Sequence, residues 1–164
     1  MKKVLLALAL MVSSLAVSAK QDAEVAGASF GASFTETLTA LKGNWGEPNT
    51  QADNKLVYLN KNFEGMKADR MEFGFQQLNG SNVLNQARVY FYCANKAAAV
   101  AKMKALVKKM EQKYAVSYDE EDGGTAFYKG GQSPLGIGSL FTIFVSPFQG
   151  KWTCQVRYGK FTFK

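Results

Sequence analysis

The chain has 164 residues, of which 47% are hydrophobic and 13% aromatic, and its formal net charge is +7. This composition supports a folded core and excludes an intrinsically disordered protein. The sequence contains no histidine, which excludes histidine-based nucleophile systems and metal sites ligated by histidine.

The first 19 residues have the three parts of a secretory signal peptide. Lys2 and Lys3 supply a positive start, the stretch 4–12 is an unbroken apolar run, and residues 17–19 are small. The apolar run is too short to span a bilayer, and no stop-transfer pattern follows it. We therefore expect cleavage after Ala19, a periplasmic or secreted protein, and no transmembrane segment in the mature form.

The chain that follows the signal peptide is about 145 residues long, which fits one domain. Without the two signal lysines its formal charge is +5, and an excess of this size serves solubility or attracts anionic partners. Residues 20–29 are small or polar and are expected to form a flexible lead. Residues 30–164 are expected to form a single α+β domain.

The first predicted helix covers about residues 33–45. Ser33 and Glu36 have the pattern of a capping box, in which each side chain satisfies a backbone amide at the helix N-terminus. Apolar residues follow at helical spacing, and Pro48 stops the helix. The sequence therefore predicts a short amphipathic helix with one buried face.

Three strands are predicted after this helix, over residues 56–59, 69–77 and 83–93. Apolar residues alternate with other residues in the second and third of them, which is typical of strands with one buried face. The less apolar face of the third strand carries Arg88, Tyr90 and Tyr92.

A second helix is predicted over about residues 96–113, with Asn95 as its N-cap and lysines around its apolar stripe. Four more strand segments follow, over residues 116–118, 125–129, 140–145 and 152–158. The acidic run 119–122 precedes two glycines and indicates a solvated turn, and the glycine-rich stretch 130–138 indicates a flexible loop.

The two halves of the chain resemble each other at a shift of about 70 residues. Gly80 then falls on Gly150, and apolar positions of the predicted helices and strands coincide. We predict an α+β fold in which an antiparallel sheet carries two helices on one face. The halves would form a tandem α-β-β-β repeat over residues 30–94 and 95–164.

Cys93 and Cys154 are the two cysteines of the chain. An even count in an oxidising compartment favours a disulfide. The bond would close a loop of about 60 residues and add about 4 kcal/mol of stability. The alternative is a pair of buried free thiols.

The best candidate for a site is the less apolar face of strand 83–93, joined by the last predicted strand. Tyrosine and arginine are enriched at binding surfaces, because they combine contact area with hydrogen bonding. The predicted binding residues are Arg88, Tyr90, Tyr92, Gln155 and Arg157. The alternative is that a helix or a second sheet covers this face and makes the tyrosines part of the core. No catalytic residue, metal site or cofactor is predicted, because the chain carries no P-loop, Rossmann or G-x-S-x-G motif.

Several short motifs resemble a pattern found in small secreted proteins of Bacteroidetes-type bacteria. They are the helix end at residues 45–48 (WGEP), Tyr58 in a strand, residues 63–65 (FEG) and residues 73–75 (FGF). The doubled order of helix and strands is similar to the fold of the beta-lactamase inhibitor proteins and, per half, to that of small outer-membrane assembly lipoproteins. The chain lacks the lipobox of those lipoproteins. The resemblance implies a fold and no activity.

These observations predict an exported, non-catalytic binding module that contacts another protein of the cell envelope. A nucleic-acid partner is not expected, given the compartment and the lack of a reading motif. The alternative is a periplasmic protein that binds a small ligand or a lipid between the sheet and the helices. The sequence leaves the partner and the oligomeric state open.

Overall fold

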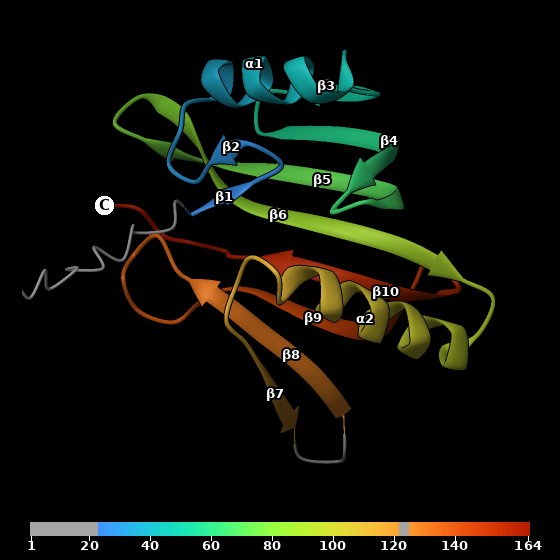
Figure 1. Cartoon of the computed structure of the whole chain (residues 1–164). Coiled ribbons are helices and arrows are strands. Elements are labelled where there is room, and N and C mark those ends of the chain that lie inside the picture. Colours follow the sequence, from blue (N-terminus) through green and yellow to red (C-terminus); the bar gives the residue numbers. More distant parts are fainter. Residues whose placement is uncertain (1–22, 122–124) are drawn as a thin grey trace, which may run out of the picture.

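The computed structural model describes residues 23–121 and 125–164. The predicted signal peptide, residues 1–19, lies outside these described residues. They form two helices, a two-stranded sheet and an eight-stranded antiparallel sheet (Figure 1), which confirms the predicted α+β class. No helix in the described part of the chain is long and apolar enough to cross a membrane.

A short hairpin, β1 (Glu24–Val25) and β2 (Ala28–Ser29), precedes helix α1 (Phe34–Trp45). The predicted capping box is confirmed at the start of α1. The Ser33 side chain accepts a hydrogen bond from the Glu36 amide, and the Glu36 carboxylate accepts one from the Ser33 amide at 2.9 Å. Two orphan amides of the first helical turn are thereby satisfied.

Each helix is followed by four strands. After α1 come β3 (Thr50–Ala52), β4 (Lys55–Phe63), β5 (Met66–Leu78) and β6 (Ser81–Cys93). Helix α2 (Lys96–Met110) has Asn95 as its N-cap, as predicted. After α2 come β7 (Val116–Glu121), β8 (Thr125–Gln132), β9 (Ser139–Phe148) and β10 (Lys151–Tyr158). The prediction of three strands after α1 is wrong by one, because all residues of β3 are exposed and carry no hydrophobic pattern.

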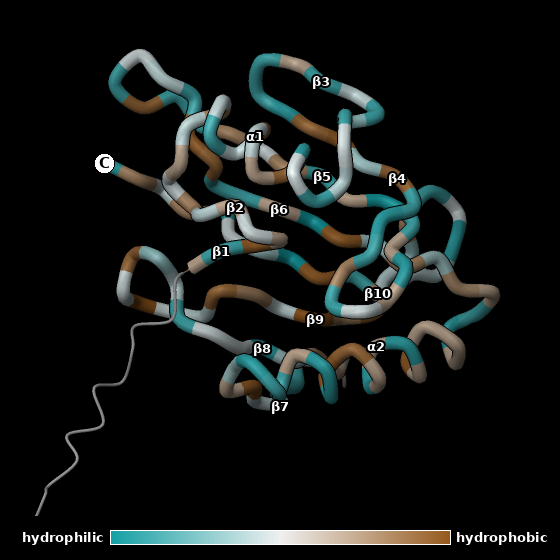
Figure 2. Tube along the Cα trace, turned by 45° about the horizontal axis from the view of Figure 1, so that its top comes forward, coloured by the Kyte–Doolittle hydropathy of each residue, from teal (hydrophilic) through white to brown (hydrophobic). Residues whose placement is uncertain are grey.

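The eight-stranded sheet has the order β3-β4-β5-β6-β10-β9-β8-β7, so the last strands of the two halves pair at its centre. One face carries the core. A row of fully buried residues crosses four strands in register: Met71, Val89, Val156 and Ile143. Both helices and the β1–β2 hairpin pack on this face (Figure 1), which confirms the prediction of two helices on one face. Figure 2 shows the resulting alternation of hydrophobic and hydrophilic residues along the strands.

The expectation of a flexible lead over residues 20–29 is wrong from residue 23 onward. Val25 and Ala28 are 2% and 1% exposed and belong to the core cluster. The Phe30 amide donates a hydrogen bond to the Ala23 carbonyl at 2.9 Å. Small residues in so short a segment give no hydrophobic period, and so the sequence did not indicate this burial.

The hairpins β5–β6 and β9–β10 match at a shift of 70 residues. Phe75 pairs with Leu84, and Val145 pairs with Cys154. The central turn residues have positive φ: Asn79 (49°) and Gly80 (82°) in one hairpin, Gln149 (50°) and Gly150 (75°) in the other. Positive φ at both positions is the type I′ geometry that suits a twisted hairpin. This agreement supports the tandem arrangement, with four strands per half rather than three, and the sequence repeat itself stays a prediction.

The predicted disulfide is wrong, because Cys93 and Cys154 are both free thiols. The register gives the reason: Cys93 pairs with Trp152, whereas Cys154 pairs with Phe91. The two cysteines are therefore diagonal neighbours on adjacent strands rather than a directly opposed pair. Burial and the neighbouring Cys93 raise the pKa of the Cys154 thiol to about 12.

Candidate binding surface on the open face of the sheet

The open face is the face of the eight-stranded sheet opposite the helices. All five predicted binding residues lie on it, on the central strands β6 and β10. The cross-strand pairs are Arg88 with Arg157, Tyr90 with Gln155 and Tyr92 with Thr153. The described residues do not support the alternative of a covered face, because both helices and the second sheet pack on the other side.

Two of the five residues form the floor of this surface. Tyr90 is 2% exposed and Gln155 is 5% exposed. The ring of Phe148, from β9, stacks on Tyr90 with 4.3 Å between ring centroids. The Gln155 side-chain amide donates a hydrogen bond to the Thr153 hydroxyl at 2.8 Å. Burial raises the pKa of Tyr90, against the opposing effect of a hydrogen bond from Arg88.

The upper layer of the open face combines cations with aromatic rings. Arg88 and Tyr92 are half-buried, and Arg157 is exposed. The Arg157 guanidinium lies 5.0 Å from the ring centroid of Phe144, and the Lys151 ammonium lies 5.1 Å from that of Tyr92. Cations held over ring faces keep their positions with their charges still available to a partner.

Phe144, Phe148 and Lys151 were not predicted as part of the surface. Residues 140–145 are apolar apart from Thr142, so the sequence does not show which side chains of β9 face outward. The alternation of polar and apolar residues in β5 did separate Arg70 and Glu72 from the core. Only the strand order places β5 and β9 on either side of the predicted residues.

Glu72 lies opposite Arg88, but its carboxylate binds two other cations. It accepts a hydrogen bond from Arg70 Nε at 2.7 Å and forms ion pairs with Arg70 Nη2 at 2.6 Å and Lys55 Nζ at 3.2 Å. Burial raises the pKa of Glu72, but the hydrogen bonds from Arg70 and Lys55 outweigh it, so the pKa lies below its ordinary value of 4.5. Glu72 therefore stays ionised at neutral pH.

We expect Glu72→Gln to lower the free energy of unfolding by about 1 kcal/mol at neutral pH. Because folding lowers the pKa of Glu72, its contribution is present above pH 4.5 and is lost as the pH falls through the folded-state pKa. Urea unfolding of wild type and variant at about pH 7 and about pH 3 measures the difference. The difference should shrink in acid, and an equal difference at both pH values would contradict this prediction. Glu47→Gln is the control, because the ion pair between Glu47 and Lys42 is exposed.

A hollow of about 380 Å³ lies at one end of the open face, where the register of β5 and β6 shifts between Gly74 and Phe75. A Cβ on Gly74 would lie 2.4 Å from the side-chain nitrogen of Gln86, so glycine leaves room for that side chain. The charged residues that line the hollow are Lys55, Glu72, Arg88 and Lys160. Its lining therefore has an excess of positive charge.

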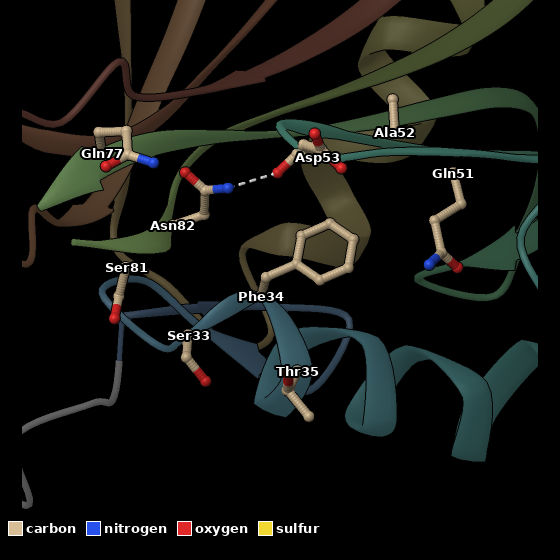
Figure 3. Close-up of a pocket in the computed structure, with 9 residues that line it drawn as sticks. All are labelled: Ser33, Phe34, Thr35, Gln51, Ala52, Asp53, Gln77, Ser81 and Asn82. Carbon is tan, nitrogen blue, oxygen red and sulfur yellow. Dashed lines mark hydrogen bonds between the residues drawn. The ribbon is translucent and has the colours of Figure 1, made fainter.

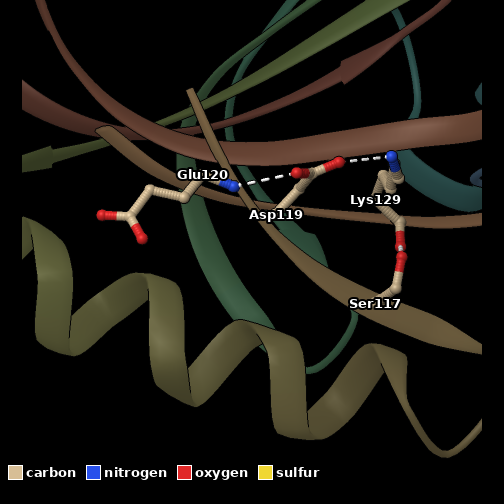
Figure 4. A network of polar contacts seen from close by, with 4 residues as sticks. All are labelled: Ser117, Asp119, Glu120 and Lys129. Carbon is tan, nitrogen blue, oxygen red and sulfur yellow. Dashed lines mark hydrogen bonds and ion pairs between the residues drawn. The ribbon is translucent and has the colours of Figure 1, made fainter. Parts of the chain in front are cut away.

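At the β7 edge, the charges of the open face are balanced. The Lys129 ammonium donates a hydrogen bond to the Asp119 carboxylate, which also accepts one from the Glu120 amide at 3.0 Å (Figure 4). The hydrogen bond from Lys129 lowers the pKa of Asp119. The predicted turn over 119–122 is a strand as far as Glu121, and residues 122–124 lie outside the described residues. Asp119 thus serves a local ion pair.

A second hollow, of about 460 Å³, lies beside the N-terminus of α1 (Figure 3). Two of its polar side chains bond within the protein: Ser33 caps α1, and the Asn82 side-chain amide donates to the Asp53 carbonyl at 2.6 Å. Its lining contains no basic side chain. We therefore place the candidate site on the open face.

No group of three or more histidine, cysteine, aspartate or glutamate side chains within residues 23–121 and 125–164 is placed to hold a metal ion. Comparison of the chain with protein-family models, with curated proteins and with solved structures found no match. The resemblance to the beta-lactamase inhibitor proteins stays a prediction.

Proposed function

We propose that this protein is an exported, non-catalytic binding module whose open face docks another protein of the cell envelope. The observation that carries the proposal is the group of arginines and aromatic rings at the centre of the sheet, on the face opposite both helices. Arginine and tyrosine are the residue types that dominate the energetics of protein interfaces. Arg88, Tyr92 and Arg157 lie together there on paired strands.

The floor of the open face supports this proposal, because it holds the contact residues in place. Tyr90 is buried and its ring stacks on Phe148, and Gln155 donates a hydrogen bond to Thr153. Central strands of an antiparallel sheet are hydrogen-bonded on both sides and move little. A rigid surface loses little conformational entropy when a partner docks, and this favours binding.

A non-catalytic role is supported by the state of the carboxylates on this face. Glu72 and Asp119 are in ion pairs with Arg70 and Lys129, and both have lowered pKa values. Such carboxylates remain ionised at neutral pH and are poor proton donors. The chain also contains no histidine that could act in their place.

The alternative proposal, a carrier of a small ligand or lipid, has less support. It needs space between the sheet and the helices. The centre of that layer is filled by side chains with no exposed surface: Leu41, Tyr58, Leu106 and Met110. A ligand of useful size would have to displace these packed residues, at a cost of several kcal/mol.

Site-specific photo-crosslinking in producing cells tests the proposed function. A benzophenone amino acid at Tyr92, on the open face, should give a discrete crosslinked product with an envelope protein. The same group at Ala105, which is exposed on α2, is the matched control and should give none. Crosslinks of equal yield at both positions, or none at Tyr92, would contradict the proposal.

A further inference from the structure

We infer that the segment that docks on the open face is acidic, and that one of its carboxylates sits in the hollow lined by Lys55, Arg88 and Lys160. This inference rests on the proposed function, because it specifies the chemistry of the partner for the same surface. Three observations carry it: unmatched positive charge, an arginine pair opposed on neighbouring strands, and a concave site beside Arg88.

Positive charge is in excess on the part of the open face formed by β4, β5, β6 and β10. The basic residues there are Lys55, Arg70, Arg88, Lys151 and Arg157. The carboxylate of Glu72 binds Arg70 and Lys55, and nearby Asp69 accepts a hydrogen bond from the Tyr92 amide at 2.7 Å. Arg88, Lys151 and Arg157 therefore have no carboxylate partner in the described part of the chain.

Arg88 and Arg157 are directly opposed on paired strands. Like charges in this arrangement destabilise a sheet. A carboxylate bound at this pair would offset the like charges and form charge-assisted hydrogen bonds with a guanidinium group. The opposed pair therefore presents two arginine side chains on neighbouring strands to an acidic partner.

The hollow gives this site its shape. It opens beside Arg88, with Lys55 and Lys160 among its other charged residues, and its volume of about 380 Å³ exceeds that of one acidic side chain. Glu72 also lines it but is already neutralised by Arg70 and Lys55. An incoming carboxylate would therefore meet three basic residues and no unpaired acid.

Helix α2 provides a comparison surface with charge but without this geometry. Lys104 and Lys108 are exposed on it, beside the exposed alanines Ala101 and Ala105. This surface has no arginine and no aromatic ring among its exposed residues. It matches the open face in unpaired positive charge, but it has neither an opposed arginine pair nor aromatic rings.

A fluorescein-labelled octaglutamate peptide is the probe, and its binding is measured by fluorescence anisotropy at low salt. We expect Arg88→Gln combined with Arg157→Gln to weaken binding by about tenfold or more. The matched control, Lys104→Gln with Lys108→Gln, removes the same charge from α2 and should change binding by less than about twofold. Lys160→Gln tests the hollow by itself, and should weaken binding by about threefold or more.

Several results would overturn this inference. They are no binding of octaglutamate by the wild type, equal weakening by the arginine and lysine pairs, or unchanged binding in the arginine variant. If the arginine variant fails to fold, unchanged binding in Lys160→Gln overturns the inference instead. If any of these results occurs together with a crosslink at Tyr92, the inference fails but the proposed function is still supported. If octaglutamate binds but no crosslink forms at Tyr92, the proposed function is contradicted.

Discussion

Replacing Tyr158 with alanine should lower the free energy of unfolding by about 3–5 kcal/mol, the range for deleting a buried aromatic ring. Tyr158 is 2% exposed at the end of β10. Its ring centroid lies 5.8 Å from that of Phe30, 6.5 Å from Phe63 and 5.7 Å from Phe141. These rings come from the segment before α1, from β4 and from β9. The substitution therefore removes contacts that join the two halves of the core.

Urea denaturation measures this loss, and Tyr158→Phe is the matched control because it keeps the ring. A loss below about 1 kcal/mol in the alanine variant would contradict a joining role for Tyr158. The Tyr158 hydroxyl should have a separate effect on stability at alkaline pH. Burial raises the pKa of Tyr158 well above its ordinary value of 10.0. Its contribution is present below pH 10 and is lost as the pH rises further, so Tyr158→Phe should remain folded to higher pH than the wild type.

Gly130→Ala is expected to lower the free energy of unfolding by about 1–3 kcal/mol through overpacking. A Cβ at this position would lie 2.7 Å from Cζ of Phe141 and 2.8 Å from the backbone carbonyl oxygen of Ala115. The carbonyl cannot rotate away as a flexible side chain could, so the backbone of β8 must shift. Thermal or urea unfolding checks this result.

Gly43→Ala is the control for this substitution. Gly43 lies in α1, and an added Cβ there would meet no atom within 4 Å. Alanine is the better helix former, and so this variant should gain about 0.5–1 kcal/mol. A loss of stability at Gly43, or none at Gly130, would show that close packing does not explain the glycine at position 130.

Gly130 also shows where a pattern in the sequence indicated the wrong local structure. The stretch 130–138 contains four glycines and predicts a flexible loop. In the structure, Gly130 is buried and β8 extends to Gln132. Glycine is present there because Phe141 and Ala115 leave no room for a side chain. Such a close approach between distant residues leaves no local signal.

The sequence by itself determined the features that depend on neighbours along the chain. The capping box of Ser33 and Glu36 and the N-cap Asn95 are local hydrogen bonds, and both are present. The period of two in β5 and β6 assigned Arg88, Tyr90 and Tyr92 to one face correctly, because successive side chains of a strand point to opposite sides. The order of helices and strands followed from the same patterns, apart from the short strands β1, β2 and β3.

Only the tertiary structure decided which strands meet. Pairing of β6 with β10 sets Arg88 opposite Arg157, and the same register leaves Cys93 and Cys154 diagonal and unbonded. The pairing of β9 with β10 brings Phe148 over Tyr90, so that Tyr90, a predicted contact residue, forms part of the floor of the open face. Strand order and register depend on contacts between residues far apart in the chain, whereas hydrophobic periodicity records only which side of a strand is buried.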